Sequence, residues 1–225
     1  MSDIVLITSV IHTGTMPWSY AKDRSVFSPE DRFRQTLETI ESIRKFLPDA
    51  KILFIECSLL RQDEIQLLQS RVDFFINVYE DEGIRNACLY TKSKGVGEAM
   101  KTRFAIDYIV NKGIGFRRLF KLSGRYSLNS KFEEENFVLE KFTFKKRIDE
   151  NYPQVVSHFT VLFSTPFHLL GTLYNALNSV IEFYKQNEPI GYEELLPILC
   201  EPKQVIETLG VQGYVAVTQN DFFTA

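Results

Sequence analysis

The chain has 225 residues, a length at the upper end of the range for a single domain. Its formal net charge of −3 at pH 7 excludes a general binder of nucleic acid or of anionic membrane surfaces. Hydrophobic residues make up 44% of the chain and charged residues 24%, which is the composition of a globular protein with a sizeable core. The 19 Phe and 10 Tyr residues predict that this core is rich in aromatic rings.

The three cysteines are far apart and form no C-x-x-C pair, so neither a zinc ribbon nor a disulfide framework is indicated. They are Cys57, Cys88 and Cys200. The apolar run near the N-terminus follows an acidic residue and is too short for a signal peptide. No run approaches the roughly 20 apolar residues that a membrane-spanning helix needs. We therefore expect a cytoplasmic protein without a transmembrane segment, whose oligomeric state the sequence leaves open.

The first elements are a buried strand and a helix, separated by a long loop. Ile4 to Val10 is an almost unbroken β-branched run, typical of a central parallel strand covered on both faces. About seventeen polar and aromatic residues follow it. Ser28 is then a suitable helix cap, with Pro29 at the first helical position and Asp31 three residues past the cap. Apolar residues recur at helical spacing up to "LPDA", at Phe33, Leu37, Ile40, Ile43 and Leu47.

Strands and helices alternate through the rest of the first 130 residues. The predicted strands after the first are Lys51–Glu56, Asp73–Val78 and Leu119–Leu122, and the predicted helices are Arg61–Gln69 and Gly97–Asn111. The polar segment between Val78 and the last of these helices is expected to be a loop. The order β-α-β-α-β-α-β predicts a mostly parallel sheet in a three-layer α/β/α sandwich.

The pattern changes after Ser130. The segments "FVLEKFTFKKRI" and "PQVVSHFTVLFST" have no helix between them and predict antiparallel or mixed strands. Two helices and a strand follow, at Pro166–Gln186, Tyr192–Leu199 and Val211–Val217. No Pro/Gly/Ser linker interrupts the chain. We therefore expect one domain made of two parts, residues 1–130 and a smaller mixed part, residues 131–225.

The long loop after the first strand excludes two common phosphate-binding motifs. A dinucleotide-binding Rossmann domain needs G-x-G-x-x-G directly after this strand, and a P-loop needs a glycine-rich turn ending in Gly-Lys. Here the segment is "IHTGTMPWSYAK", with one glycine. A loop rich in side chains is better suited to contact a nucleobase and a ribose. The missing turn also disfavours a methyltransferase that would bind ribose through Glu56.

The segments "ITSVIHTG", "DRSVFSPEDRFRQTLETIESIRKFLPDAKILFIECS", "KSKGVGEA" and "LFKLSGRYSLNSKF" resemble a group of small glycosyltransferases with the GT-A-like fold. These proteins occur in large viruses, phages and bacterial surface-polysaccharide clusters. The resemblance covers Asp3 to Phe132, and the K-L-S-G-R-Y segment is its most specific part. It implies a nucleotide-sugar-binding half, residues 1–130, and an acceptor half, residues 131–225. A viral chain would act in the host cytoplasm.

The sequence departs from the GT-A pattern at the metal site. Enzymes of that type usually carry D-x-D after the fourth strand, and no D-x-D occurs in this chain. Ser123, Gly124, Arg125 and Tyr126 stand in its place. A guanidinium can neutralise a leaving diphosphate without a metal ion, and a glycine lets the backbone approach a ligand. We expect no metal and no cofactor, with Arg125 at the diphosphate. The alternative role for Arg125 is an ion pair with Glu56 or Asp81.

The other expected donor-binding residues lie at strand ends and in loops. They are Thr8, Ser9, His12, Arg24, Glu56, Lys94, Gly95, Gly97, Ser123, Gly124, Tyr126 and Asn129. Short hydroxyls at the end of the first strand suit a base or ribose, and amides at a helix start suit an anion. Three of these residues have a structural alternative. In that alternative His12 is a loop histidine whose hydrogen bonds are satisfied within the protein, Tyr126 packs its ring in the core, and Asn129 forms a turn. Trp18 and Tyr20 either stack on the ligand or anchor the loop.

A catalytic base is harder to assign from the sequence. An inverting transferase needs a carboxylate near the acceptor hydroxyl. Glu193 and Glu194 begin a short helix in the acceptor half, although acids in a first turn are also ordinary helix chemistry. His158 and His168 flank an apolar run and are expected to be core or edge residues.

These features together predict transfer of a sugar from a nucleotide-sugar donor to a glycan or lipid-linked acceptor. The runner-up is a non-catalytic module that binds a nucleotide-sugar or a glycan. It would keep Arg125 and the first loop but lack a working base.

Overall fold

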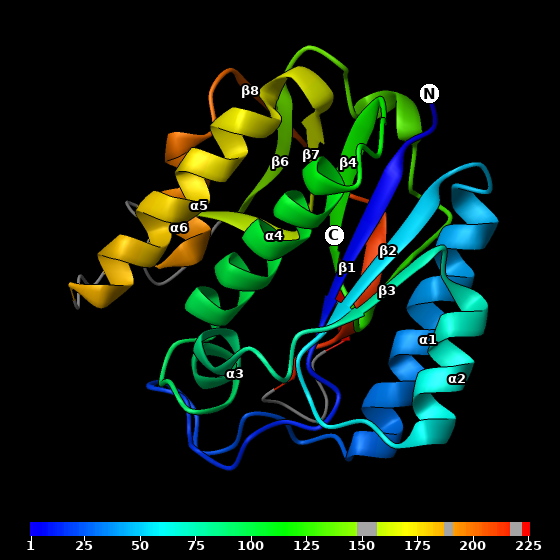
Figure 1. Ribbon diagram of the computed structural model, residues 1–225. Coiled ribbons are helices and arrows are strands. Elements are labelled where there is room, and N and C mark those ends of the chain that lie inside the picture. The colour runs from blue at the N-terminus through cyan, green and yellow to red at the C-terminus, as the bar shows by residue number, and fades with distance from the viewer. Residues whose placement is uncertain (148–156, 187–190, 217–221) are drawn as a thin grey trace.

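The computed structural model describes residues 1–147, 157–186, 191–216 and 222–225. Helices cover both faces of a central sheet, so the predicted α/β/α sandwich is confirmed (Figure 1). The helices α1 (Pro29–Phe46) and α2 (Gln62–Arg71) cover one face. On the other face lie α4 (Lys94–Asn111), α5 (Leu170–Lys185) and α6 (Tyr192–Leu199).

The central sheet has seven strands in the order β3-β2-β1-β4-β7-β6-β8. Its strands are β1 (Ile4–Ser9), β2 (Lys51–Glu56), β3 (Phe74–Asn77), β4 (Arg118–Ser123), β6 (Phe142–Arg147), β7 (Ser157–Pro166) and β8 (Lys203–Ile206). The first four are parallel, while β7 runs antiparallel to both β4 and β6. Because β4 pairs with β7, the two parts of the chain share one sheet.

Helix α1 begins as its sequence predicts. The hydroxyl of Ser28 accepts the Asp31 N–H at 3.1 Å, and Pro29 occupies the first turn. Ile40 and Ile43 are buried against the sheet. Local chemistry and hydrophobic spacing therefore determine where this helix lies.

The polar segment expected to be a loop before α4 contains a helix, α3 (Glu82–Leu89). Asp81 caps it by accepting the Ile84 N–H at 2.9 Å. The helix is only eight residues long, and the run of three acids that leads into it, residues 80–82, obscured the hydrophobic pattern. The next helix, α4, begins at Lys94 and not at Gly97 as predicted.

A second sheet of three strands was not predicted as such. It consists of β5 (Tyr126–Leu128), β9 (Val211–Tyr214) and β10 (Phe222–Thr224), all antiparallel. The sequence predicted a strand at Val211–Val217 but gave no signal for β5, β8 or β10, which have three or four residues each. Two short 3-10 helices, η1 (Glu134–Asn136) and η2 (Phe167–Leu169), complete the elements.

Some sequence predictions fall outside the described residues: Ile148 at the end of the first mixed strand, residues 153–156 before β7, and Val217 after β9. The antiparallel pairing of β6 with β7 confirms the mixed character expected after Ser130.

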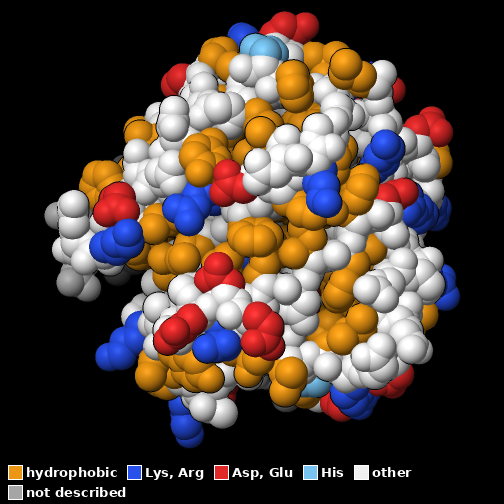
Figure 2. All heavy atoms as spheres, viewed as in Figure 1, with side chains coloured by type: hydrophobic (Ala, Val, Ile, Leu, Met, Phe, Trp, Pro, Cys, Tyr) orange, Lys and Arg blue, Asp and Glu red, His pale blue; other side chains and the backbone are white. Residues whose placement is uncertain are grey.

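The core is aromatic, as the composition predicts. Fully buried rings include Phe54, Phe116, Phe120, Phe137, Phe142, Phe144 and Phe163. Cys57, Cys88 and Cys200 are buried free thiols. No helix in the described part of the chain is both long and apolar enough to cross a membrane. On the face in Figure 2, charges of both signs are interspersed, with acidic side chains grouped over α3.

Candidate functional site

The parallel strands bring four of the predicted residues to one edge of the sheet. Ser9 ends β1 and Glu56 ends β2, and the two are partners in the strand register. Thr8 is the register partner of Ser123, the last residue of β4. We call this the carboxyl edge. It is where ligands bind in open α/β sheets.

The loop between β1 and α1, residues 10–28 and hereafter the first loop, is held by an arginine. The Arg24 guanidinium is buried and donates to the carbonyl oxygens of Met16, Cys88 and Thr91, the Cys88 bond measuring 2.7 Å. Its carbon Cζ also lies 3.8 Å from the centre of the Trp18 ring. Arg24, predicted to bind the donor, therefore holds the first loop against α3.

Trp18 and Tyr20 have different environments in the first loop. Their rings are nearly parallel, with centroids 6.4 Å apart. Trp18 donates from its indole nitrogen to the Arg24 carbonyl at 3.3 Å, so it anchors the loop. Tyr20 is 64% exposed and is available to a ligand.

Glu56 is the most buried carboxylate at the carboxyl edge. One oxygen, Oε1, accepts the Ile11 N–H at 2.9 Å and the Ser58 hydroxyl at 2.7 Å. The other, Oε2, is buried and has no hydrogen-bond partner among the described residues. A buried oxygen without a partner is costly unless a ligand or water supplies a donor.

His12 lies beside this carboxylate but interacts with another one. Its Nε2 atom is 3.1 Å from Oε2 of Glu64 in α2, and its backbone N–H donates to Ser58 at 3.2 Å. The ring is only partly buried. His12 is thus tied to α2 while keeping one face accessible.

Gly124 sits in close contact with β1. A Cβ atom at this position would lie 3.1 Å from side-chain carbons of both Ile7 and Ser9. Its N–H donates to the Thr8 carbonyl at 3.0 Å, so the ladder between β1 and β4 continues past Ser123. The glycine brings the chain close to β1 just before Arg125.

Arg125 projects beyond the carboxyl edge and is half-buried. The one hydrogen bond of its guanidinium to the described residues runs to the Tyr214 carbonyl at 3.3 Å. The ion pairs with Glu56 or Asp81 that would give it a structural role are not formed, since these acids bond to backbone and hydroxyl groups. Burial lowers the pKa of the Arg125 guanidinium, which nevertheless stays charged at neutral pH.

A second arginine adds positive charge near Arg125. The Arg32 guanidinium is buried and donates to the carbonyls of Val10 and Ile11 and to the Ser25 hydroxyl. Burial lowers its pKa, and the charge of Arg125 lowers it further. Two guanidiniums within electrostatic range of one another favour an anion between the first loop and β9.

The two glycines at the start of α4 serve close packing. A Cβ on Gly95 would overlap the Tyr184 hydroxyl and the Tyr192 Cβ, at 2.3 and 2.6 Å. A Cβ on Gly97 would lie 2.9 Å from the Cys88 sulfur. These glycines let α4 approach α3, α5 and α6, so their contacts lie within the protein.

We expect Gly95→Ala to destabilise the protein by about 1–3 kcal/mol, because the added methyl group overpacks the contact with two tyrosines. Thermal unfolding measures this. Gly171→Ala in α5 is the matched control, since nothing lies within 4 Å of its Cβ position. Equal melting temperatures for Gly95→Ala and the parental chain would contradict the packing role.

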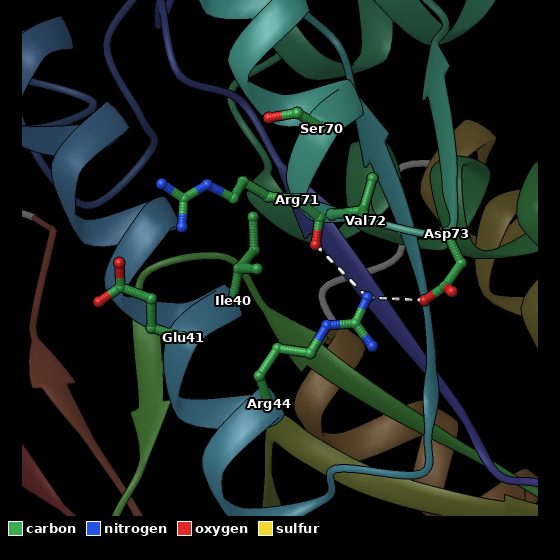
Figure 3. Close-up of a pocket in the computed structure, with 7 residues that line it drawn as sticks. All are labelled: Ile40, Glu41, Arg44, Ser70, Arg71, Val72 and Asp73. Atoms are coloured by element: carbon green, nitrogen blue, oxygen red, sulfur yellow. Dashed lines mark hydrogen bonds and ion pairs between the residues drawn. The ribbon is translucent and has the colours of Figure 1, made fainter.

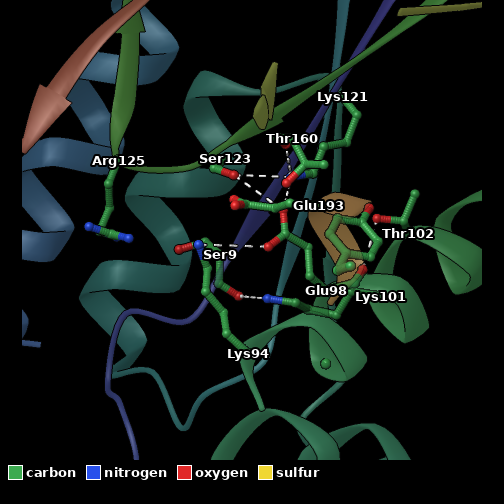
Figure 4. Close-up of polar contacts among 12 residues, drawn as sticks. Ser9, Lys94, Glu98, Lys101, Thr102, Lys121, Ser123, Arg125, Thr160 and Glu193 are labelled. Atoms are coloured by element: carbon green, nitrogen blue, oxygen red, sulfur yellow. Dashed lines mark hydrogen bonds and ion pairs between the residues drawn. The ribbon is translucent and has the colours of Figure 1, made fainter. Parts of the chain in front are cut away.

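A buried charged network lies beneath the α4 side of the edge. The Lys121 ammonium donates to Glu98, to the Ser123 hydroxyl at 3.0 Å and to the Thr160 carbonyl at 3.0 Å (Figure 4). Lys121 is not among the site residues predicted from the sequence. The sequence nevertheless indicated a special role for this lysine, because it interrupts an otherwise apolar strand, "LFKLS".

Two further lysines reach the same region. Lys101 is buried and donates to the Ser9 carbonyl at 2.7 Å. Lys94, the first residue of α4, is 43% exposed, and its Nζ atom lies 3.9 Å from Oε2 of Glu98. Lys94 is therefore the more accessible of the two cations.

The two predicted bases differ in their surroundings. Glu193 is half-buried, pairs with Arg147 of β6, and is close enough to affect the charge of Lys121. Glu194 folds back over Gly191, so that a Cβ on that glycine would meet its carboxylate. Only Glu193 is thereby linked to the network at the carboxyl edge.

Tyr126 and Asn129 lie away from the edge. Tyr126 is buried and meets the Phe223 ring edge-on, with centroids 5.6 Å apart. The Asn129 side chain accepts the Lys131 N–H at 2.9 Å within a turn. His158 is buried against Phe144, and burial lowers its pKa, as expected of a core histidine.

Two pockets in the described part of the chain lie elsewhere. One of about 540 Å³ lies between α1, α2 and the start of β3, at the opposite edge of the sheet (Figure 3). There Arg44 bonds to Asp73 at 2.8 Å. Another, of about 370 Å³, is lined by Phe116, Phe167 and His168. Neither contains a residue of the carboxyl edge.

The residues at the end of β4 do not fit a divalent metal ion. Such ions prefer carboxylate oxygens, whereas the chain offers a serine and an arginine there, with Lys121 two residues before the serine. Among the described residues, no group of three or more His, Cys, Asp or Glu side chains is placed so that it could hold a metal ion.

No protein-family model and no curated protein sequence matches the chain. Solved structures do. An active-site mutant of LgtC, a galactosyltransferase, superposes with a TM-score of 0.52 at 11% identity, over 90% of this chain and 72% of that one. The glycosyltransferase GlyE of Streptococcus pneumoniae TIGR4 gives 0.51 at 11% identity, over 92% and 45%. The chain thus spans less than half the length of GlyE.

A glycosyltransferase involved in glycosylation of the PBCV-1 major capsid gives a TM-score of 0.49 at 11% identity, over 93% of this chain and 84% of that one. At such identities the likeness concerns the fold alone. The expected GT-A-like fold is confirmed by the first two structures. The narrower group suggested by the K-L-S-G-R-Y segment stays a prediction.

Proposed function

We propose that the protein is a glycosyltransferase that moves a sugar from a nucleotide-sugar donor to a glycan or lipid-linked acceptor. The observation that carries this proposal is Arg125, a half-buried cation at the carboxyl edge of a GT-A-like sheet. Among the described residues its guanidinium makes one hydrogen bond, at 3.3 Å to a carbonyl, and forms no ion pair; it also lies 5.7 Å from the centre of the Tyr126 ring. Function does not follow from a fold, so the proposal depends on this site and on its test.

In the proposed complex the base and ribose lie under the first loop. The Oε2 atom of Glu56, which has no partner among the described residues, accepts a bond from the nucleoside, and Tyr20 and His12 supply further contacts to it in this proposal. The diphosphate lies against Arg125, within the field of Arg32. Residues 1–130 thus bind the donor and residues 131–225 the acceptor.

The transfer step uses one base. Glu193 takes the proton of the acceptor hydroxyl while that oxygen bonds to the anomeric carbon of the donor sugar. The bond from this carbon to the diphosphate oxygen breaks, and the nucleoside diphosphate leaves with the electron pair. Arg125 stabilises the charge that grows on the diphosphate. This direct displacement inverts the anomeric centre.

A non-catalytic nucleotide-sugar or glycan-binding module is the second candidate. It is favoured by the environment of the two acids, since Glu193 is paired with Arg147 and Glu194 covers Gly191. A carboxylate held in an ion pair is a weaker base.

A panel of nucleotide-sugars tests both candidates. Thermal shift with UDP-, GDP- and CMP-sugars identifies the donor class, and release of free nucleotide in the same samples reports turnover. Binding with turnover supports the transferase, and binding without turnover, with sugar acceptors present, supports the module. A chain that binds no member of the panel contradicts both.

We expect donor binding to be independent of metal ions, because Arg125 stands where D-x-D carboxylates would hold one. Titration calorimetry with the best donor, in EDTA and in Mn²⁺, should give affinities within a few-fold of each other. Binding that EDTA abolishes and Mn²⁺ alone restores would contradict this expectation.

A further inference from the structure

Lys121 and Glu98 form an ion pair in which the lysine is completely buried. Lys121 is 0% exposed, and its nitrogen donates to three oxygen acceptors. Three acceptors require the protonated amine with its three N–H groups. Burial lowers the pKa of Lys121 well below its ordinary value, the charge of Lys94 lowers it further, and the charge of Glu193 raises it.

The stability of the fold does not account for the presence of a buried ion pair of this kind. Removing two charges from water costs several kcal/mol per ion, and apolar residues of similar size often replace a buried pair without loss. The same strand offers a comparison at its other end, where Arg118 and Asp3 form a second buried pair. Both Asp3 oxygens are bonded there, Oδ1 to Arg117 at 2.9 Å and Oδ2 to Arg118 at 2.6 Å.

Glu98 differs from Asp3 because, among the described residues, only one of its oxygens accepts a hydrogen bond. Oε1 accepts from Lys121 and from the Ser123 hydroxyl, the latter at 3.3 Å. Oε2 forms an ion pair with the Lys94 ammonium at 3.9 Å, a distance beyond hydrogen-bond length. The carboxylate is therefore fixed in orientation through one oxygen and leaves the other available as an acceptor.

In the proposed complex this oxygen lies close to the diphosphate. Ser123, which bonds to Glu98, precedes Arg125 by two residues, and two extended residues span at most about 7 Å. Figure 4 shows Arg125, Ser123 and Glu98 in that order across the edge of the sheet. A sugar attached to a diphosphate at Arg125 would reach Glu98.

We propose that Oε2 of Glu98 accepts a hydrogen bond from a hydroxyl of the donor sugar, and that this sugar is uncharged. The proposal rests on the proposed function. An ionised carboxylate only accepts hydrogen bonds, so it suits a hydroxyl and repels the carboxylate of an acidic sugar. Lys94 offsets that repulsion weakly, because it is exposed and screened by solvent.

Calorimetry with UDP, UDP-glucose, UDP-glucuronate, GDP and GDP-mannose tests the proposal. The parental chain should bind the neutral nucleotide-sugar at least about tenfold more tightly than the glucuronate. Glu98→Gln should weaken the neutral sugar about tenfold, because a neutral amide is a poorer acceptor. The affinity for the nucleoside diphosphate alone should not change.

Two further variants separate recognition from stability. Glu98→Gln leaves the Lys121 charge buried without its partner, so the single variant is at risk of unfolding. The double variant Glu98→Gln with Lys121→Met removes both charges, and it should fold and show the same loss for the neutral sugar. Asp3→Asn, at the other end of β4, is the matched control: it should lower stability and leave the ratio of sugar to diphosphate affinity unchanged.

The outcomes distinguish a failure of this proposal from a failure of the proposed function on which it rests. Equal losses for the diphosphate and its sugar in the double variant would overturn the role of Glu98 and leave the transferase intact. So would a parental chain that binds glucuronate as well as glucose. A parental chain that binds neither diphosphate nor sugar overturns both the proposed function and this inference.

Discussion

Arg125→Ala is expected to weaken donor binding by about ten- to a hundredfold, because it removes a charge-assisted contact worth roughly 1.5–3 kcal/mol. Turnover should fall further than binding does. The negative charge on the leaving diphosphate grows in the transition state, so the guanidinium contributes more there than in the bound donor. Calorimetry with the donor and initial rates of nucleotide release measure the two effects.

Two variants serve as controls for this result. Arg125→Lys restores the charge without the forked geometry and should recover only part of the lost affinity. Arg34→Ala removes an exposed arginine of α1 and should change neither quantity. An Arg125→Ala protein with a lower melting temperature and unaltered affinity for the donor would show that the arginine is structural.

Glu193→Ala is expected to reduce turnover by about 10²–10⁴-fold, the usual loss when a general base is removed. Donor affinity should change little, since Glu193 faces the acceptor in the proposed complex. The loss should be seen in single-turnover rates with saturating donor, which separate chemistry from binding.

Glu194→Ala is the natural control, because the two acids are neighbours in the same helical turn and only Glu193 is linked to the network around Lys121. It should keep near-parental turnover. Near-parental turnover in a folded Glu193→Ala protein would mean that the base lies elsewhere or that the reaction does not invert the anomeric centre.

Much of the fold follows from local patterns in the sequence. The apolar run of β1 and the Ser28-Pro29 start of α1 were predicted close to their observed bounds. Hydrophobic period and helix caps are properties of neighbouring residues, so they can be recognised without the partners. The alternating order of elements then determines the parallel sheet, and with it the edge at which Ser9, Glu56 and Ser123 meet.

Short strands were missed because their stability comes from distant partners. β5 has three residues and pairs with β9, about 85 positions later in the chain, as the register of Tyr126 with Gly213 illustrates. Three residues are too few to display an alternating pattern. Similarly, α3 is a short helix whose start is strongly charged, and its contact with α4 is what stabilises it.

The roles of individual charged residues depended on tertiary structure most of all. Arg24 and Arg125 are the same residue type in polar loops, yet Arg24 is buried against carbonyls of residues 88 and 91 while Arg125 has one long bond. The composition of the sequence shows that the chain has enough apolar residues to form a core. The spacing of those residues along the chain shows which helices and strands contribute to the core. Only the folded chain decided which cations are paired, because a charge is neutralised by whatever lies within a few ångströms, and those partners come from distant positions such as Glu98 and Lys121.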